Sequence, residues 1–248
     1  SQPALFTDPP MWVRNQSNSR HGVEFAYYTG VDMKKYYRRY CEALLAVDDS
    51  VGRLLGNLEK SGELEDTVIL YLGDNGFIFG EHGLIDKRCA YDESIRIPML
   101  MRYPKSLKPG TKVEKIVANI DVAPTLLEVA GLKSKERMDG ESFWQLAKGK
   151  GSSDWRKYLL YEYYWERNYP QTPTNHAVIG EDYKYIRYHG VWDQDELYHT
   201  KSDPKERKNL FNDSSQKSRI TEMNKALFDL LADSSGENMP LLRDRGTK

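Results

Sequence analysis

The residues best suited to chemistry lie in the stretch from 67 to 98. Residues 68–72 form a run of apolar, β-branched and aromatic side chains that predicts a buried strand. The run ends at Gly73, and Asp74 and Asn75 follow directly. They stand at the carboxyl end of a strand, where open α/β sheets place their ligand sites. One carboxylate and one amide oxygen suit a hard cation such as Ca²⁺ or Mg²⁺.

A glycine-rich segment follows this pair and carries further polar residues. Residues 76–90 contain three glycines, which allow the chain to fold back over the end of the strand. Lys87 adds a positive donor for an anionic group bound to the cation. His82 has two interpretations, as a residue of the pocket or as a residue that orders the loop through a hydrogen bond. The pattern predicts a site that holds a cation and an anion together.

The longer string resembles a known family of enzymes. G-D-N-G, G-E-H-G, D-K and Y-D-E-S-I-R-I-P are similar to the second half of the catalytic domain of type I sulfatases, formylglycine-dependent enzymes of the alkaline phosphatase superfamily. The resemblance implies that Asp74 and Asn75 bind Ca²⁺ and that Lys87 binds sulfate. His82 joins Lys87 as a candidate catalytic residue, and because the role of the G-x-H-G histidine differs between subfamilies, both interpretations of His82 stay open. The similarity is closest to glycosaminoglycan sulfatases such as N-acetylglucosamine-6-sulfatases.

The elements around this stretch favour an α/β fold. An apolar stripe at three- and four-residue steps predicts a helix from Asp32, its N-cap, to about Lys60. A short buried strand is expected at residues 99–101, and a helix capped by Asp121 is expected to end at Gly131. Alternating helices and strands, with the resemblance, predict the second half of a sulfatase-like, mainly parallel αβα sheet.

The composition changes near residue 148. K-G-K-G-S-S indicates a linker, and the chain beyond it is rich in tyrosine and contains several short strands in succession. Successive strands favour a small antiparallel sheet, and an amphipathic helix at residues 220–231 can cover one face of it. We therefore expect residues 1–147 to form the C-terminal part of the sulfatase catalytic domain and residues 148–248 to form a C-terminal α+β subdomain.

Two residues of this second part are candidates for binding substrate. His176 enters a predicted strand, and Arg167 lies beside Trp165. A histidine next to aromatic surface can bind a sugar hydroxyl or a sulfate. ELYHTKSDPKERKNL also resembles the sulfatase string L-Y-D-L-x-x-D-P-x-E-x-x-N-L, with His199 where an acidic residue usually stands. The resemblance implies a sulfated saccharide as the substrate.

Charge and hydropathy exclude some classes of protein. The chain has 36 basic and 37 acidic residues and a net charge of −1, which gives no electrostatic reason to expect a nucleic-acid partner. No apolar run approaches the roughly 18 residues of a membrane span, and no signal peptide is recognisable. The family suggests a periplasmic, extracellular or lysosomal-type compartment. Cys41 and Cys89 are expected to be free thiols.

The nucleophile of the family has no counterpart in this sequence. Sulfatases make formylglycine within a C/S-x-P/A-S/x-R motif, and neither Cys41 nor Cys89 stands in such a motif. We therefore expect the chain alone to be inactive and its partner to be the missing N-terminal half of the catalytic domain. One alternative is a phosphate or phosphonate monoester hydrolase of the same superfamily, which Asn75 disfavours because histidine is usual there. Another is a noncatalytic saccharide-binding module.

Overall fold

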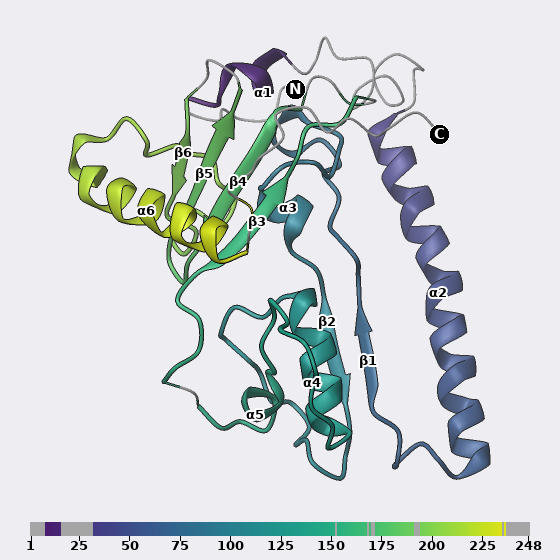
Figure 1. Cartoon of the computed structure of the whole chain (residues 1–248). Helices are drawn as coiled ribbons and strands as arrows, with labels where there is room; N and C mark the ends of the chain where they lie inside the picture. Colours follow the sequence, from purple (N-terminus) through teal and green to yellow (C-terminus); the bar gives the residue numbers. More distant parts are fainter. Residues whose placement is uncertain are drawn as a thin grey trace. The chain divides into compact units, whose positions relative to one another are not determined.

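A computed structural model describes residues 8–15, 32–151, 153–167, 169, 172–190, 194–234 and 236 (Figure 1). The chain divides into two compact units. The first comprises residues 1–36, 75–96 and 157–248, and the second comprises residues 37–74 and 97–156. Each unit is described by itself.

The predicted long helix is present as α2, Met33–Ser61. The backbone N–H of Lys34 donates to Asp32 Oδ1 at 3.0 Å, so Asp32 caps the helix as expected. Gly62 ends it in the left-handed conformation, with a φ of 75°. No helix in the described part of the chain is both long and apolar enough to cross a bilayer. Cys41, which is exposed on α2, and the buried Cys89 are free thiols, as predicted.

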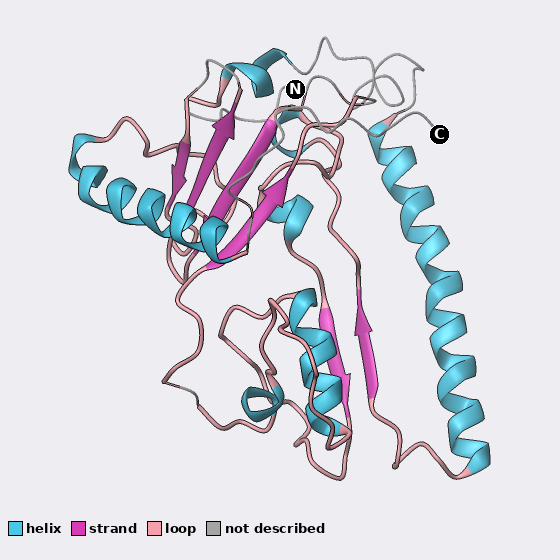
Figure 2. Cartoon of the chain, viewed as in Figure 1, coloured by secondary structure: helices cyan, strands magenta, loops and turns pink. Residues whose placement is uncertain are grey.

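The second unit contains two strands, β1 (Ile69–Leu72) and β2 (Met99–Arg102). They pair antiparallel with Ile69 opposite Arg102, so the prediction of a mainly parallel sheet is wrong for the described residues. A parallel pair needs a crossover that runs back along the sheet, usually a full helix. Figure 2 shows mainly loop between these strands, with the short η3 (Glu81–Gly83) and α3 (Asp92–Ile95). Leu100 is 65% exposed, so β2 is not the buried strand expected.

The second unit continues after β2 with short helices. It includes η4 (Asn119–Asp121), α4 (Val122–Val129) and α5 (Trp144–Ala147). Met99 and Met101 contact a cluster around Phe143 and Trp144. The fully buried Asp121 stands at the start of α4 but does not cap it with its side chain. Its carboxylate pairs instead with Arg156 and accepts from the backbone N–H groups of Ala118 and Glu141.

The first unit is built on the predicted antiparallel sheet. Its strands lie in the order β3 (Leu159–Tyr163), β4 (Thr174–Ile179), β5 (Lys184–His189) and β6 (Glu196–Tyr198), and all neighbours are antiparallel. The unit also contains α1 (Met11–Asn15), η5 (Ser214–Gln216) and α6 (Lys217–Asp233). Figure 1 shows α6 lying across β3–β6. This part of the predicted fold is confirmed.

The two faces of this sheet have different partners. Side chains alternate between the faces along each strand. One face packs against α6 through Val178, Tyr185, Leu197, Met223, Leu227 and Leu231. The other face packs through Ala177, Ile186 and Tyr188 against residues 78–91, the glycine-rich segment of the predicted site. The C-terminal sheet therefore supports this segment, and the division at residues 147 and 148 stays a prediction.

Candidate functional site

Asn75 and Lys87 form the centre of the candidate site. Lys87 Nζ donates to Asn75 Oδ1 at 3.0 Å, and Asn75 Nδ2 donates to the carbonyl oxygen of Gly76 at 2.7 Å. The Lys87 side chain is exposed, and Asp74, the residue before Asn75, is exposed as well. The fold thus brings a predicted metal ligand and the predicted sulfate-binding residue into direct contact across 12 residues of sequence.

Ser94, in the short helix α3, bonds to the backbone of Lys87 and to that of Gly76, the residue after Asn75. The Ser94 hydroxyl donates to the carbonyl oxygen of Lys87 at 2.6 Å, and the Ser94 carbonyl oxygen accepts from the N–H of Gly76 at 2.7 Å. A Cβ atom on Gly76 would lie 2.2 Å from the carbonyl oxygen of Glu93. Only glycine permits this close approach, so its place in the D-N-G string has a steric reason.

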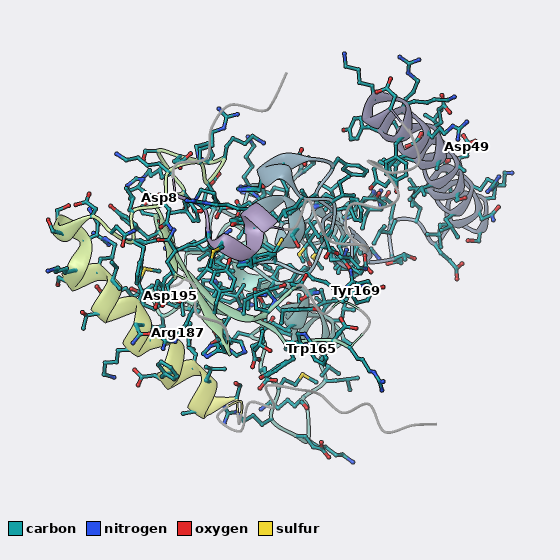
Figure 3. The ribbon with its side chains drawn as sticks, turned by 90° about the horizontal axis from the view of Figure 1, so that it is seen from above. Asp8, Asp49, Trp165, Tyr169, Arg187 and Asp195 are labelled. Carbon is teal, nitrogen blue, oxygen red and sulfur yellow. The ribbon has the colours of Figure 1, made fainter. Side chains whose placement is uncertain are left out.

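Two charged residues beside Lys87 were not assigned a role from the sequence. Arg88 Nη1 lies 2.5 Å from Asp86 Oδ1, which also accepts from the backbone N–H of Lys87 at 2.7 Å. The Arg88 guanidinium stacks 3.2 Å from the ring centroid of Tyr169, which is labelled in Figure 3. An arginine–carboxylate pair supplies donors and acceptors that suit sugar hydroxyls. In the sequence, the triplet D-K-R at residues 86–88 is the feature that could have pointed to Asp86 and Arg88.

His82 is buried in η3 and has a φ of 54°, in the left-handed region. Its ring stacks on Tyr91 with a centroid distance of 3.8 Å and an interplanar angle of 8°. Its Nε2 lies 3.3 Å from Glu93 Oε2. Burial favours a raised pKa for Glu93, but the hydrogen bond with His82, a backbone hydrogen bond and the charge of Lys205 together lower that pKa to about 2. Glu93 is therefore an ionised partner that orients the imidazole.

A group of metal-ligand type surrounds this histidine. One ligand atom each of His82, Glu93 and Glu206 lies within 4.8 Å of the others. The Nζ of the fully buried Lys184 lies 2.7 Å from Glu206 Oε1 and also pairs with Asp92. Burial alone would lower the pKa of Lys184, but these two carboxylates raise it. The ammonium group of Lys184 therefore already supplies positive charge to the cluster of His82, Glu93 and Glu206. This cluster does not include the predicted metal ligands Asp74 and Asn75.

The predicted substrate residues lie in different environments. Arg167 is exposed in the turn after β3. His176 is fully buried, with Nδ1 2.9 Å from His189 Nε2. His176 lies on the same face of β4 as Val178, which packs on α6, whereas Ala177 faces residues 78–91. The ring of His176 is therefore on the opposite face of the sheet from the segment that contains Lys87.

The α6 side of the sheet carries a polar group of its own. Figure 3 shows Arg187 and Asp195 near one another beside α6, and Arg187 Nη1 lies 3.3 Å from Asp195 Oδ2. Tyr185 donates to the same carboxylate oxygen at 2.5 Å. These contacts join β5 to the residue before β6 and have a structural explanation without a ligand.

Comparisons with known proteins agree with the geometry. The family model described as "Sulfatase" matches residues 9–132, and the model described as "N-sulphoglucosamine sulphohydrolase, C-terminal" matches residues 80–233. An N-acetylglucosamine-6-O-sulfatase of Bacteroides thetaiotaomicron is 35% identical over an alignment of 243 residues, which covers 92% of this chain and 42% of that protein. The N-acetylglucosamine-6-sulfatase of Bos taurus is 42% identical over 140 residues, 56% of this chain and 25% of that protein.

A solved structure has the same fold over most of the chain. It is a protein in complex with its substrate D-glucosamine-2-N,6-O-disulfate, with a TM-score of 0.79, 32% identity and coverage of 91% of this chain and 46% of that one. The chain spans less than half the length of these similar proteins. The two family models together match residues 9–233. The chain belongs to the sulfatase family.

Proposed function

We propose that this chain is the C-terminal portion of a sulfatase that hydrolyses sulfate monoesters of a sulfated saccharide, with 6-O-sulfated glucosamine units as the substrate. The observation that carries the proposal is the hydrogen bond between Lys87 and Asn75. The substrate class rests on the names of the similar N-acetylglucosamine-6-sulfatases and on the sulfated glucosamine bound by the similar structure.

The donors after β1 fit the family's metal. Asp74 and Asn75 supply a carboxylate and an amide oxygen, the ligand type of Ca²⁺ and also of Mg²⁺. The bound cation would supply positive charge that offsets the negative charge of the sulfate ester. Lys87 would bind a sulfate oxygen through its ammonium group. Because Lys87 also donates to Asn75, the anion-binding and metal-binding residues are held together before the substrate arrives.

The other predicted site residues receive narrower roles. His82 would act in proton transfer, since the ionised Glu93 orients its ring. Arg167 offers an exposed guanidinium to a sulfate or a sugar hydroxyl. His176 stays a substrate-binding proposal that requires its buried ring to become accessible. Asp86 and Arg88 flank Lys87 and are added as candidates for contact with sugar hydroxyls.

The proposed partner is a segment that carries the formylglycine nucleophile, which this sequence lacks. It would complete the catalytic domain to which residues 1–147 contribute, while residues 148–248 form the C-terminal subdomain. Large apolar side chains on α2 and β2 support such a partner, because Leu45 and Leu54 on α2 and Leu100 on β2 are 64–65% exposed. The compartment proposed from the family is periplasmic, extracellular or lysosomal-type.

The test is to assay hydrolysis of 6-sulfated N-acetylglucosamine by the chain, alone and mixed with the N-terminal portion of a similar sulfatase. We expect turnover only in the mixture, because the chain can stabilise a sulfate but has no attacking group. Lys87→Ala should reduce kcat/KM by at least about 100-fold, the size of losing one stabilising donor. The matched control is Lys201→Ala, an exposed lysine 3.5 Å from Asp182, which should leave kcat/KM unchanged.

The same preparation separates the alternatives. A phosphate or phosphonate hydrolase would turn over those esters faster than the sulfate ester in the mixture. A saccharide-binding module would bind the sulfated sugar equally well after Asp74, Asn75 and Lys87 are all changed to alanine. Turnover by the unmixed chain that Lys87→Ala abolishes would mean that the nucleophile lies within this sequence.

A further inference from the structure

A fully buried carboxylate accepts hydrogen bonds from three tyrosines in the first unit. Glu196, at the start of β6, accepts from the hydroxyls of Tyr188 on β5 and of Tyr198 on β6. The hydroxyl of Tyr91 lies 3.1 and 2.9 Å from the two Glu196 oxygens. Burying an ionised carboxylate is costly unless such donors compensate it. The three hydroxyls satisfy both oxygens, so the group forms a closed polar network inside an apolar core.

Tyr91 differs from the other two tyrosines because its ring reaches the candidate site. It stacks flat on the imidazole of His82 at 3.8 Å, whereas Tyr198 meets Tyr91 edge-on at 6.3 Å. Glu196 is 105 residues from Tyr91 in the sequence and belongs to the C-terminal ELY string. A residue of the C-terminal sheet thus fixes the hydroxyl end of the ring on which His82 rests.

The backbone on either side of Tyr91 is also fixed from the C-terminal sheet. Lys184 Nζ, from β5, donates to the carbonyl oxygen of Ala90 at 2.9 Å. Glu206, from the segment after β6, accepts the backbone N–H of Asp92 at 2.8 Å. Tyr91 is therefore held at its hydroxyl and at both adjoining peptide groups, which leaves its ring one position.

Backbone strain coincides with this network. Among the described residues, the non-glycine residues with positive φ are Asp8, His82 and Glu206, and the last two belong to the cluster beneath the candidate site, with φ of 54° and 47°. A left-handed residue other than glycine is strained, and it persists where its surroundings enforce it. For His82 the enforcing contacts are the Tyr91 ring and the Glu93 carboxylate.

We propose that Glu196 and Tyr91 are positioning residues for His82. Glu196 fixes the Tyr91 hydroxyl, and the Tyr91 ring fixes the plane of the His82 imidazole. The hydrogen bond with Glu93 then fixes the orientation of the imidazole within that plane. The inference rests on the proposed function for the role of His82 in proton transfer. Glu196 of the C-terminal ELY string would therefore affect the chemistry of the segment around His82 and Tyr91, which lies more than 100 residues earlier in the sequence.

The test compares variants that remove one hydroxyl each from the same carboxylate. The ¹³C–¹H signals of the His82 ring are recorded on the whole chain, assigned by their loss in His82→Gln. In the wild type, the stacked ring current of Tyr91 shifts these signals upfield. Tyr91→Phe keeps an aromatic ring but loses the anchor, so the signals should move downfield. Tyr198→Phe is the matched control, because it removes a bond to Glu196 without touching His82, and the signals should stay in place.

The outcomes are decisive in both directions. Glu196→Gln should move the His82 signals in the same direction as Tyr91→Phe, and if it fails to fold, the tyrosine comparison alone decides. Unchanged signals in a folded Tyr91→Phe chain would overturn the proposal, as would an equal shift in Tyr198→Phe. Because this measurement needs no sulfate ester, its result is separate from that of Lys87→Ala, which tests the proposed function.

In the mixture with the N-terminal portion, Tyr91→Phe should lower kcat by about tenfold or more while KM changes less than about twofold, since a displaced proton-transfer group affects the chemical step. Equal losses of kcat in Tyr91→Phe and Tyr198→Phe would indicate a general loss of stability and contradict the positioning role.

Discussion

Buried ionisable side chains of the first unit have pKa values shifted in opposite directions. Burial raises the pKa of Glu196 to about 7, although the three tyrosine hydroxyls oppose the change. Burial also lowers the pKa of His176 to about 4, with a further contribution from His189. Burial and the charge of Arg187 lower the pKa of His189 to about 4. Burial therefore disfavours the charged form at all three positions.

The histidine pair should make the fold sensitive to acid. The two histidines have a pKa near 6.5 in the unfolded chain and near 4 in the folded chain, so between these values the unfolded chain binds more protons. Their contribution to stability is therefore complete above about pH 6.5 and is lost as the pH falls to 4. We expect the free energy of unfolding to drop over this window by about 3 kcal/mol for each histidine that becomes protonated. Urea unfolding at several pH values measures it, and His176→Gln combined with His189→Gln should flatten the curve.

Glu196 should give the opposite slope. Its folded pKa lies above the unfolded value of 4.5, so the folded chain binds more protons and loses stability as the pH rises from about 4.5 to 7. In Glu196→Gln, the free energy of unfolding should fall less between pH 4.5 and 7 than it does in the wild type. If the two substitutions change the curve in the same direction, the assignment of neutral histidines and a proton-binding Glu196 is wrong.

Among the elements, the short helix α3 decides the geometry of the site. Its four residues are too few to form a stable helix alone, so it depends on the contacts around it. Ser94 bonds to the backbones at Gly76 and Lys87, and Glu206 accepts the N–H of Asp92. These contacts fix the turn that keeps Asn75 and Lys87 together.

Gly76→Ala should break this arrangement. The new Cβ would lie 2.2 Å from the carbonyl oxygen of Glu93, a backbone atom that cannot move aside as a side chain can. We expect a loss of about 1–3 kcal/mol in the free energy of unfolding, the usual cost of overpacking. The chemical shift of the Asn75 side-chain amide should change as well, since its Nδ2 donates to the carbonyl of residue 76.

Gly52→Ala is the matched control for that substitution. Gly52 lies inside α2, and nothing is within 4 Å of its new Cβ. Alanine in a helix interior is preferred over glycine by about 0.5–1 kcal/mol, so this variant should be slightly more stable than wild type. Equal behaviour of the two variants would show that the close approach at Gly76 is not tight.

At the scale of the whole molecule, the proposed metal site has few ligands from this chain. Asp74 and Asn75 offer two protein oxygens and one negative charge, whereas Ca²⁺ takes six to eight oxygen ligands. Calorimetry on this chain should therefore give a Kd weaker than about 1 mM, below the affinity of sensor sites. A submicromolar Kd would contradict the expectation. Sensitivity of any binding to Glu206→Gln rather than Asp74→Asn would place the ion in the His82 cluster instead.

Local patterns predicted the elements whose stability is local or nearly so. The periodicity of α2 and α6 and the alternation of side chains along β5 are visible in the sequence because a helix or strand brings residues to the same face at a fixed spacing. The D-N-G and D-K strings likewise identified the neighbours Asn75 and Lys87, which lie only 12 residues apart. The direction of β2 was missed, because pairing between strands depends on the path of the chain between them.

The surroundings of the candidate site depend on contacts between distant segments, which no sequence pattern shows. A buried lysine between carboxylates and a glutamate among three tyrosines look like ordinary polar residues of strands in the sequence. Lys184 meets Asp92 across 92 residues of sequence and Glu196 meets Tyr91 across 105, and no local period encodes such contacts. The alternation of side chains along β4 does not say which face of the sheet His176 occupies, so its position also depends on packing. Sequence patterns were enough to predict the family, most of the elements and the reactive residue types. Packing of the sheet on residues 78–91 selects which of these residues meet, because burial there penalises any polar group that is left unpaired.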